Sequence, residues 1–260
     1  MKTRVLGCAL AAILLMVFAS GCVGGEYVTA SKNYITKEMK MDNFHAVNLQ
    51  GSGNVAYRQG DEPRVEIYGS DNVVEKLDVF VEGGTLYLKY KKGVRVRGDS
   101  KLSYRVYSPE LNGLSINGAG NVMFANGVNS QGDLSVTING SGNIKGEAMR
   151  CRDLSVKING SGRVDLKGIE SASCSFAING SGDLRLGGTS GTIDMRISGA
   201  GNIRADELKA GSVSVGISGS GDVKCYATEK LKARISGAGN IGYKGDPKEI
   251  DVPRKGVRKL

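Results

Sequence analysis

Apolar and polar residues alternate along most of this chain of 260 residues, and a short glycine phrase interrupts the alternation at regular intervals. Residues 134–138, for example, read Leu-Ser-Val-Thr-Ile, with every second side chain apolar. A period of two predicts β-strands, because successive side chains of a strand point to opposite faces. The β-branched residues at the apolar positions favour the same structure. The pattern therefore predicts an all-β protein.

The glycine phrase reads apolar, polar, Gly, Ser or Ala, Gly, turn residue, apolar, and it occurs eight times. Its first glycines are Gly51, Gly118, Gly140, Gly160, Gly180, Gly199, Gly219 and Gly237. From Gly118 onward the copies lie 22, 20, 20, 19, 20 and 18 residues apart. A nearly constant period of this length indicates a solenoid, in which each repeat buries its apolar face only against its neighbours.

Alignment of the copies produces two columns that are apolar at every position. The residue two before the first glycine is Leu49, Ile116, Ile138, Ile158, Ile178, Ile197, Ile217 or Ile235. The residue four after it is Val55, Val122, Ile144, Val164, Leu184, Ile203, Val223 or Ile241. We predict a single-stranded parallel β-helix with about 18–22 residues per coil, in which equal positions stack in one core. We expect the helix to be right-handed, because that hand prevails in this class of fold.

An array of antiparallel hairpins is the alternative architecture, because Asn-Gly also favours two-residue hairpin turns. Parallel coils explain the identical residues in each column more simply. They also align the residues before the glycines into one row of four amides and three hydroxyls: Asn117, Asn139, Asn159, Asn179, Ser198, Ser218 and Ser236. A stacked amide can donate to one neighbour and accept from the other, so we predict a ladder of hydrogen bonds.

Two glycines flank a small residue at each predicted corner. Glycine adopts positive φ without steric cost, whereas a Cβ in such a conformation costs roughly 1–2 kcal/mol. A phosphate-binding loop is the competing interpretation. That loop requires a helix after the glycines, and a strand residue follows them here, so the glycines are expected to serve the corner.

The first 22 residues do not share the repeat. Lys2 and Arg4 precede an apolar run that is short for a membrane span. Residues 19–22 read Ala-Ser-Gly-Cys and resemble a bacterial lipobox, although Ala19 stands where leucine is usual. The resemblance implies that residues 1–21 are a signal peptide and that Cys22 carries a lipid. An ordinary secretory signal followed by a chance cysteine is the alternative.

The remaining chain is expected to form a tether over residues 22–40 and one β-helix domain over residues 41–260. Residues 114–260 contain the regular coils, and residues 41–113 are interpreted as degenerate coils. Residues 252–260 are interpreted as one eroded final coil.

Three features stand out in the degenerate part. Residues 65–73 resemble an eroded copy of the glycine phrase, and residues 82–85, Glu-Gly-Gly-Thr, predict a tight hairpin turn. Six of the ten tyrosines lie here: Tyr57, Tyr68, Tyr87, Tyr90, Tyr104 and Tyr107. We expect these rings to pack in the core or along its edge, with an aromatic platform for sugars as the alternative.

The chain carries a formal net charge of +9, and removal of Lys2 and Arg4 with the signal leaves 33 basic against 26 acidic residues. A lipid-anchored envelope protein rarely meets nucleic acid, so anionic glycan, lipid headgroups or another envelope protein is the expected partner. Five residues after the first glycine, successive copies carry Lys145, Asp165, Arg185, Arg204 and Lys224. We regard Lys145, Arg185, Arg204 and Lys224 as a candidate ligand face. The alternative is a solvated edge that discourages aggregation.

No constellation in the sequence predicts catalysis, a cofactor or a metal site. His45 is the only histidine, and it is expected to be structural. Three cysteines follow Cys22 without a zinc-ligand spacing; Cys174 and Cys225 fall on core positions of the repeat. Asp78, Asp99 and Asp165 are scattered in sequence, so only convergence in space could build the carboxylate cluster that a polysaccharide lyase needs.

The iterated Ile-Asn-Gly-Ser/Ala-Gly phrase resembles the GIN head-domain family of putative auto-transporter adhesins. Glu-Lys-Leu at residues 75–77 and Gly-Thr-Leu-Tyr-Leu-Lys-Tyr at residues 84–90 fit the same family, and the resemblance covers about residues 42–260. It implies a parallel β-helix at the cell envelope with an adhesion role and without catalytic residues.

We therefore expect a lipoprotein of the cell envelope, in the outer membrane, that acts as a non-catalytic binding module. A polysaccharide-active β-helix enzyme and a purely structural envelope protein are the alternatives. The side of the membrane, the ligand and the oligomeric state stay open.

Overall fold

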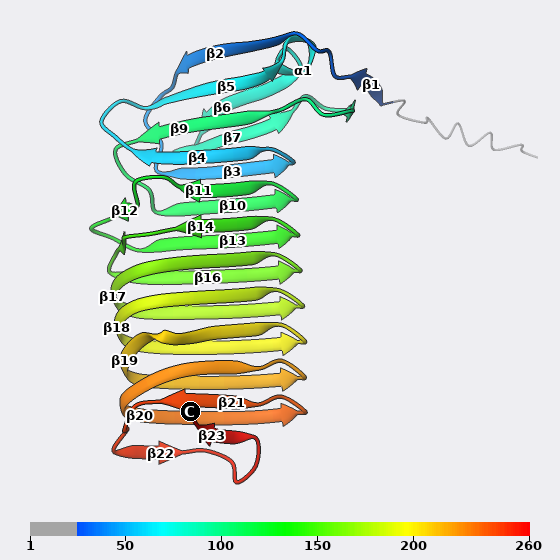
Figure 1. Ribbon diagram of the computed structural model, residues 1–260. Coiled ribbons are helices and arrows are strands. Elements are labelled where there is room, and N and C mark those ends of the chain that lie inside the picture. The colour runs from blue at the N-terminus through cyan, green and yellow to red at the C-terminus, as the bar shows by residue number, and fades with distance from the viewer. Residues whose placement is uncertain (1–24) are drawn as a thin grey trace, which may run out of the picture.

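Successive copies of the glycine phrase lie directly on one another in the computed structural model, which describes residues 25–260 (Figure 1). Ile138 is the register partner of Ile158, and Ile158 is the partner of Ile178, in parallel strands. All three side chains are fully buried in one continuous core. The predicted parallel β-helix is thus confirmed, and the hairpin array is excluded. The expectations for residues 1–21 and Cys22 lie outside the described residues.

The strands of the solenoid form two faces that meet at the glycine corners. The first face holds the strands before each corner: β3 (Ala46–Gly51), β10 (Gly113–Gly118), β13 (Leu134–Gly140), β16 (Asp153–Gly160) and the ends of β17 (Arg163–Gly180), β18 (Asp183–Gly199), β19 (Asn202–Gly219) and β20 (Val223–Gly237). The second face holds the strands after each corner: β4 (Asn54–Gln59), β11 (Asn121–Phe124), β14 (Asn143–Gly146), the starts of β17 to β20, and β21 (Ile241–Lys244). The short strands β12 (Val128–Asn129) and β15 (Met149–Arg150) lead back toward the first face.

The two glycines of each corner have different reasons to be glycine. Gly140 has a φ of +137°, which side chains avoid, and a Cβ there would meet the carbonyl oxygen of Gly118 on the neighbouring coil. Gly142 has no such φ, but a Cβ on it would lie 2.9 Å from Cγ2 of Ile116. The positive φ therefore requires glycine at the first position. The close approach of neighbouring coils requires glycine at both positions, because a Cβ at either would clash.

The predicted amide ladder is present beside the corners. Nδ2 of Asn139 donates to Oδ1 of Asn117 at 2.8 Å, and the same bond joins Asn159 to Asn139 at 2.7 Å and Asn179 to Asn159 at 2.9 Å. Ser198 continues the row in register. These amides satisfy one another along the solenoid axis, which holds successive coils in register.

A second ladder runs on the other side of the corners, where the sequence predicted only turn residues. Asn121 donates to Asn54 at 2.9 Å, and Asn143 donates to Asn121 at 2.8 Å. Further along, Asn202 donates to Asp183 at 3.1 Å and Asn240 donates to Asp222 at 3.1 Å. Each corner is thus flanked by a polar row on either side. The asparagines after the corners form hydrogen bonds between coils in addition to favouring the turn.

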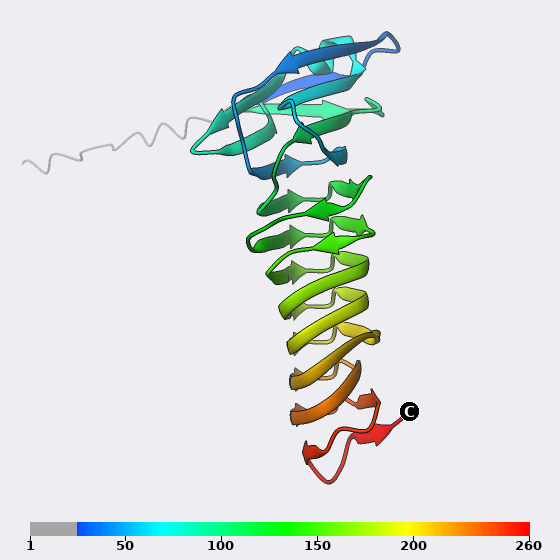
Figure 2. The same cartoon turned by 90° about the vertical axis from the view of Figure 1, so that its left-hand side faces the viewer.

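A cap covers the N-terminal end of the solenoid (Figures 1 and 2). It consists of β1 (Glu26–Thr29), β2 (Tyr34–Lys40), β5 (Arg64–Ser70), the short helix α1 (Asp71–Val74), β6 (Leu77–Glu82), β7 (Thr85–Tyr90), β8 (Val94–Arg97) and β9 (Ser103–Ser108). Strands β7 and β9 pair in parallel with β3 and β4, whose other neighbours are β10 and β11. The first copy of the glycine phrase therefore lies directly beneath the cap, and the chain builds the cap before it returns to the next coil.

The predicted hairpin over residues 82–85 is confirmed, because β6 and β7 are antiparallel and Gly83 and Gly84 have φ values of +56° and +72°. The eroded copy over residues 65–73 was a wrong prediction. Strand β5 is antiparallel to both β2 and β9 and leads into α1. Asp71 stands where a coil has its second glycine, and its carboxylate accepts hydrogen bonds from Ser31 and Asn33. These bonds direct the chain into the helix.

The expected tether over residues 22–40 is corrected for the part that the structure describes. Strand β2 pairs with β5 along its whole length, from Tyr34 with Ser70 to Lys40 with Arg64. This pairing covers a sheet edge that would otherwise expose backbone donors and acceptors. The repeat pattern does not predict this strand, because antiparallel cap strands do not follow the period of the coils. Within residues 25–260 no helix is long and apolar enough to cross a membrane.

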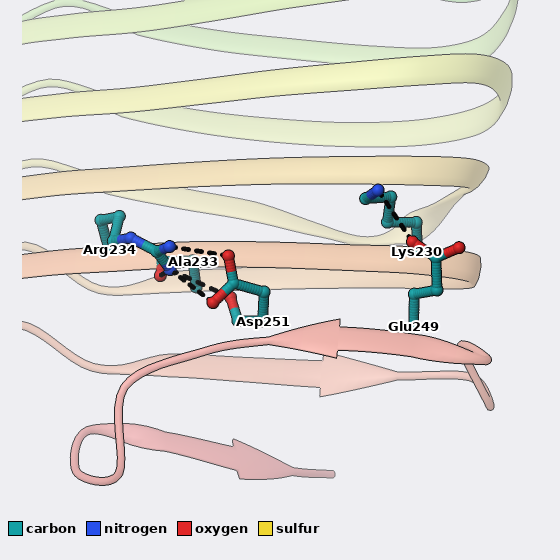
Figure 3. A network of polar contacts seen from close by, with 5 residues as sticks. All are labelled: Lys230, Ala233, Arg234, Glu249 and Asp251. Carbon is teal, nitrogen blue, oxygen red and sulfur yellow. Dashed lines mark hydrogen bonds and ion pairs between the residues drawn. The ribbon is translucent and has the colours of Figure 1, made fainter.

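The last coil closes the opposite end and matches the predicted eroded coil. It consists of β22 (Glu249–Asp251), paired with β20, and β23 (Val257–Lys259), paired with β21. Arg234 donates to both carboxylate oxygens of Asp251, at 3.0 and 2.6 Å, and Lys230 lies 2.8 Å from Glu249 (Figure 3). These partners lower the pKa of both carboxyls. The ion pairs fasten a coil that buries little apolar surface.

The corner geometry predicts that Gly140→Ala destabilises the protein by about 2 kcal/mol or more, because the new Cβ combines an unfavourable φ with a clash against Gly118. Thermal unfolding followed by circular dichroism measures this as a lower Tm. Ser141→Ala is the matched control, since Ser141 is exposed at the same corner, and its Tm should match that of the wild type. Equal Tm values for all three proteins would contradict the account of the corner.

Candidate ligand-binding face

The register of the coils brings the candidate ligand residues into one row on the second face. Lys145 pairs with Asp165, Asp165 with Arg185, Arg185 with Arg204, and Arg204 with Lys224. Successive strands lie about 4.8 Å apart, so this row follows the solenoid axis. We call these five residues the charged row. The four cations are exposed and Asp165 is half-buried.

Like charges meet in the lower part of the charged row, where Arg185, Arg204 and Lys224 occupy three successive coils. Arg185 has a partner in Glu207, with 3.8 Å between Nη2 and Oε1. Among the described residues, Arg204 and Lys224 take part in no ion pair, and the nearby Asp206 binds Lys244 at 3.0 Å. Like charges directly opposite in a sheet are destabilising, so this arrangement opposes the stability of the fold and favours an anionic partner.

A groove of about 580 Å³ lies on the second face above the charged row. The floor contains Ala56 and Met123, which precede Lys145 in the same row, and the methionine side chain is 51% exposed. Amides of the second ladder, Arg105 and Arg163 form the polar walls. The groove ends at Lys145 and Asp165, which also line it. The groove and the charged row thus form one continuous surface, in which Ala56 and Met123 lie between Arg105 on the cap side and the charged row.

Asp165 has an unusual position in this surface. Its Oδ1 atom is buried and finds no hydrogen-bond partner within residues 25–260. A buried acceptor without a donor costs about 1–3 kcal/mol.

The sequence singled out only the cationic half of this surface. The missed residues, Ala56, Met123 and Arg105, occupy the same row on the coils toward the cap. Alignment places Ala56 and Met123 five residues after Gly51 and Gly118, so the row could have been extended upward from the sequence. Arg105 could not, because it lies in a strand of the cap.

A second cationic row lies on the first face but is largely neutralised. Lys157, Arg196 and Arg234 alternate in register with Ala177 and Gly216. Arg196 lies 2.5 Å from Asp194, and Arg234 holds Asp251. These arginines have structural partners, so we assign no ligand to this row.

The structure does not gather the scattered carboxylates. Asp78 lies 3.5 Å from Lys89 on the cap hairpin, Asp99 lies 2.6 Å from Lys101 in a loop, and Asp165 lies on the second face. Within residues 25–260 no three His, Cys, Asp or Glu side chains are grouped to hold a metal ion. His45 packs its ring against Gly84 of the hairpin. This arrangement offers no carboxylate cluster of the kind that the lyase hypothesis requires.

The cysteines and two of the six tyrosines in residues 41–113 are part of the core, whereas Tyr68 is exposed. Cys151, Cys174 and Cys225 are buried free thiols, as expected for Cys174 and Cys225. Burial raises the pKa of Cys225 to about 12 and that of Cys151 to about 11. Burial also raises the pKa of Tyr57 and Tyr104, whose rings are 1% and 2% exposed. The thiols are therefore poor nucleophiles, and these two rings are unavailable to a sugar.

The fold and this surface define a β-solenoid scaffold with a groove and a charged row on one face. The family model described as "Putative auto-transporter adhesin, head GIN domain" matches residues 43–247. A crystal structure of a putative adhesin from Bacteroides fragilis is 32% identical, covers 90% of this chain and 100% of its own, and has a TM-score of 0.70. The chain belongs to this family of putative adhesins with a GIN head domain, whose description names adhesion and no reaction.

Two further crystal structures support the fold. A putative lipid binding protein from Parabacteroides distasonis is 26% identical, covers 90% of this chain and 100% of its own, with a TM-score of 0.83. A putative adhesin from Parabacteroides merdae is 24% identical, covers 90% and 99%, and has a TM-score of 0.82. Among curated proteins no sequence matches the chain.

The like charges of the charged row predict that Arg204→Gln stabilises the protein by a few tenths of a kcal/mol at low salt. The gain should vanish at high salt, which screens exposed charges. Thermal unfolding at two salt concentrations measures it. Lys157→Gln is the control, because its register neighbours Thr137 and Ala177 are uncharged, and its Tm should stay unchanged. A lower Tm for Arg204→Gln at low salt would contradict this electrostatic account.

Proposed function

We propose that this protein is a lipid-anchored adhesin of the outer membrane that binds an anionic glycan along the second face of its solenoid. The charged row carries the proposal, because three cations stand on successive coils and two of them lack an ion-pair partner among residues 25–260. Carboxylate or sulfate groups of an extended polymer would separate these like charges. The straight axis of the solenoid suits a linear ligand.

The groove supplies the complementary contacts for the sugar rings. Met123 and Ala56 offer an apolar surface, and the amides of Asn121 and Asn143 border it. The carboxylate of Asp165 lines the groove and is an acceptor for a sugar hydroxyl. Such a mixture of an apolar floor and a few placed polar groups is typical of ligand sites.

The proposal predicts that the mature chain, kept free of lipid by Cys22→Ser, binds acidic polysaccharides on a glycan array and that salt weakens the binding. The triple variant Arg185→Gln/Arg204→Gln/Lys224→Gln should bind about tenfold more weakly, since each exposed ion pair contributes modestly. Surface plasmon resonance with the best array ligand measures this ratio.

The matched control removes three exposed lysines that lie off the second face, Lys37→Gln/Lys157→Gln/Lys232→Gln, and leaves the same net charge. This control should bind like the wild type. Equal loss in both triple variants would mean that net charge alone attracts the polymer. The absence of any acidic ligand on the array would refute the glycan proposal.

The proposed anchor predicts a diacylglycerol-modified N-terminal Cys22 after cleavage of residues 1–21. Mass spectrometry of the protein extracted from bacterial membranes checks the modification, and Cys22→Ser should release the chain into the soluble fraction. Sucrose-gradient separation of the membranes tests the outer-membrane location. An unmodified N-terminus at another residue would contradict the anchor without affecting the glycan test.

A further inference from the structure

A small basic ribbon projects from the cap at the end of the molecule opposite the C-terminus (Figures 1 and 2). It consists of β1 and β8, a two-stranded parallel sheet separate from the main sheet. Val28 of β1 faces the body and is buried, whereas the Tyr27 side chain is 53% exposed. Tyr27 and Arg95 are register partners, and so are Thr29 and Arg97. The outer face of the ribbon therefore carries an aromatic ring, a hydroxyl and two cations.

The ribbon has a strong and uncompensated positive charge. Residues 91–97 read Lys-Lys-Gly-Val-Arg-Val-Arg, and all four cations are exposed. Two nearby carboxylates already have partners, since Glu26 lies 2.6 Å from Lys76 and Asp99 lies 2.6 Å from Lys101. Among residues 25–260 none of the ion pairs includes a cation of this segment.

Tyr27 organises the two arginines at the centre of this surface. The Arg97 guanidinium lies 4.0 Å from the centre of the Tyr27 ring, and Nη1 of Arg95 donates to the Tyr27 hydroxyl at 3.1 Å. Both guanidinium groups keep most of their donors free for phosphate oxygens. Tyrosine with lysine and arginine is the composition found where proteins meet the polar surface of a membrane.

The length of chain between the anchor and the ribbon sets a short limit on their separation. Strand β1 begins at Glu26, four residues after Cys22. An extended chain spans at most about 3.3–3.6 Å per residue, so Glu26 lies within about 14 Å of a lipid-modified Cys22 at the bilayer surface. This short connection lets the ribbon lie within one Debye length of the bilayer surface, about 8 Å at physiological salt.

We propose that the β1–β8 ribbon is a membrane-contact surface that binds the phosphate groups of anionic phospholipids. This inference rests on the anchor at Cys22 that forms part of the proposed function. The diacylglycerol attaches the chain to the bilayer, and the ribbon adds an electrostatic contact that orients the cap on the membrane surface. They hold the capped end of the solenoid at the bilayer, and the coils that carry the charged row extend away from it toward the ligand.

Vesicle binding of the mature chain with Cys22→Ser tests the ribbon without the anchor. The chain should bind vesicles of phosphatidylcholine with phosphatidylglycerol and should not bind vesicles of phosphatidylcholine alone. Arg95→Gln/Arg97→Gln should weaken the binding about 30-fold. Lys91→Gln/Lys92→Gln, which alters the loop before β8 and leaves both strands intact, should weaken it similarly.

Control variants separate charge from folding and the ribbon from the second face. Arg95→Lys/Arg97→Lys keeps the charge and should retain most of the binding. The triple variant of the charged row should bind vesicles like the wild type, and both ribbon variants should keep glycan binding. Unchanged vesicle binding of both ribbon variants, equal loss in the charged-row variant, or binding to a soluble phosphorylated polysaccharide in preference to the vesicles would overturn the proposal.

A fluorescent reporter tests the contact in the anchored protein. The chain contains no tryptophan, so Tyr27→Trp introduces a single probe on the ribbon and Met123→Trp introduces one in the groove. In lipidated protein reconstituted in vesicles, brominated phosphatidylglycerol should quench the first probe and leave the second unaffected. Equal quenching of both would place the side of the solenoid on the bilayer and overturn the proposed orientation. If Cys22 proves unmodified, the vesicle assay still decides whether the ribbon binds lipid.

Discussion

The close, in-register stacking of parallel coils is the constraint on which the rest of this structure depends. Each coil buries its isoleucines only against the coils above and below, so the core exists only if equal positions coincide. The glycine corners make that coincidence sterically possible, since a Cβ at Gly140 or Gly142 would collide with the neighbouring coil. The amide ladders then oppose slippage between coils, because a shift of one residue would separate each donor from its acceptor.

The same stacking turns a linear repeat into functional surfaces. A residue type that recurs at one position becomes a row along the axis, with side chains about 4.8 Å apart. Amides in such a row satisfy one another, whereas cations such as Arg204 and Lys224 repel one another. A favourable row therefore serves stability, and the unfavourable charged row is the observation on which the proposed ligand rests. This contrast distinguishes the charged row from the first-face arginines Arg196 and Arg234, which pair with Asp194 and Asp251.

The two ends of the solenoid solve the problem of exposed strand edges differently. At the C-terminal end a short coil is fastened by ion pairs with Lys230 and Arg234. At the N-terminal end, β7 and β9 pair in parallel with the first coil, antiparallel strands extend the cap beyond them, and the cap carries the basic ribbon. The cap thus terminates the solenoid and also presents the surface that we assign to the membrane. The proposed membrane contact and the proposed ligand face therefore lie on the same scaffold.

The sequence by itself determined the parallel coils, the core columns, the first amide ladder and the cationic half of the candidate site, because a period-two pattern repeated with a fixed spacing has one simple stacking. It also identified the hairpin over residues 82–85 from its glycines. Only the tertiary structure decided the cap, where β5 pairs antiparallel with β2 and β9, and the extension of the binding surface to Arg105. Such contacts join strands that share no repeat, so no local pattern in the sequence predicts them. The ribbon was not predicted either, because β1 and β8 share no repeat. The cations of β8 gain a role in the proposal only because the fold places β8 beside β1, at the start of the described chain.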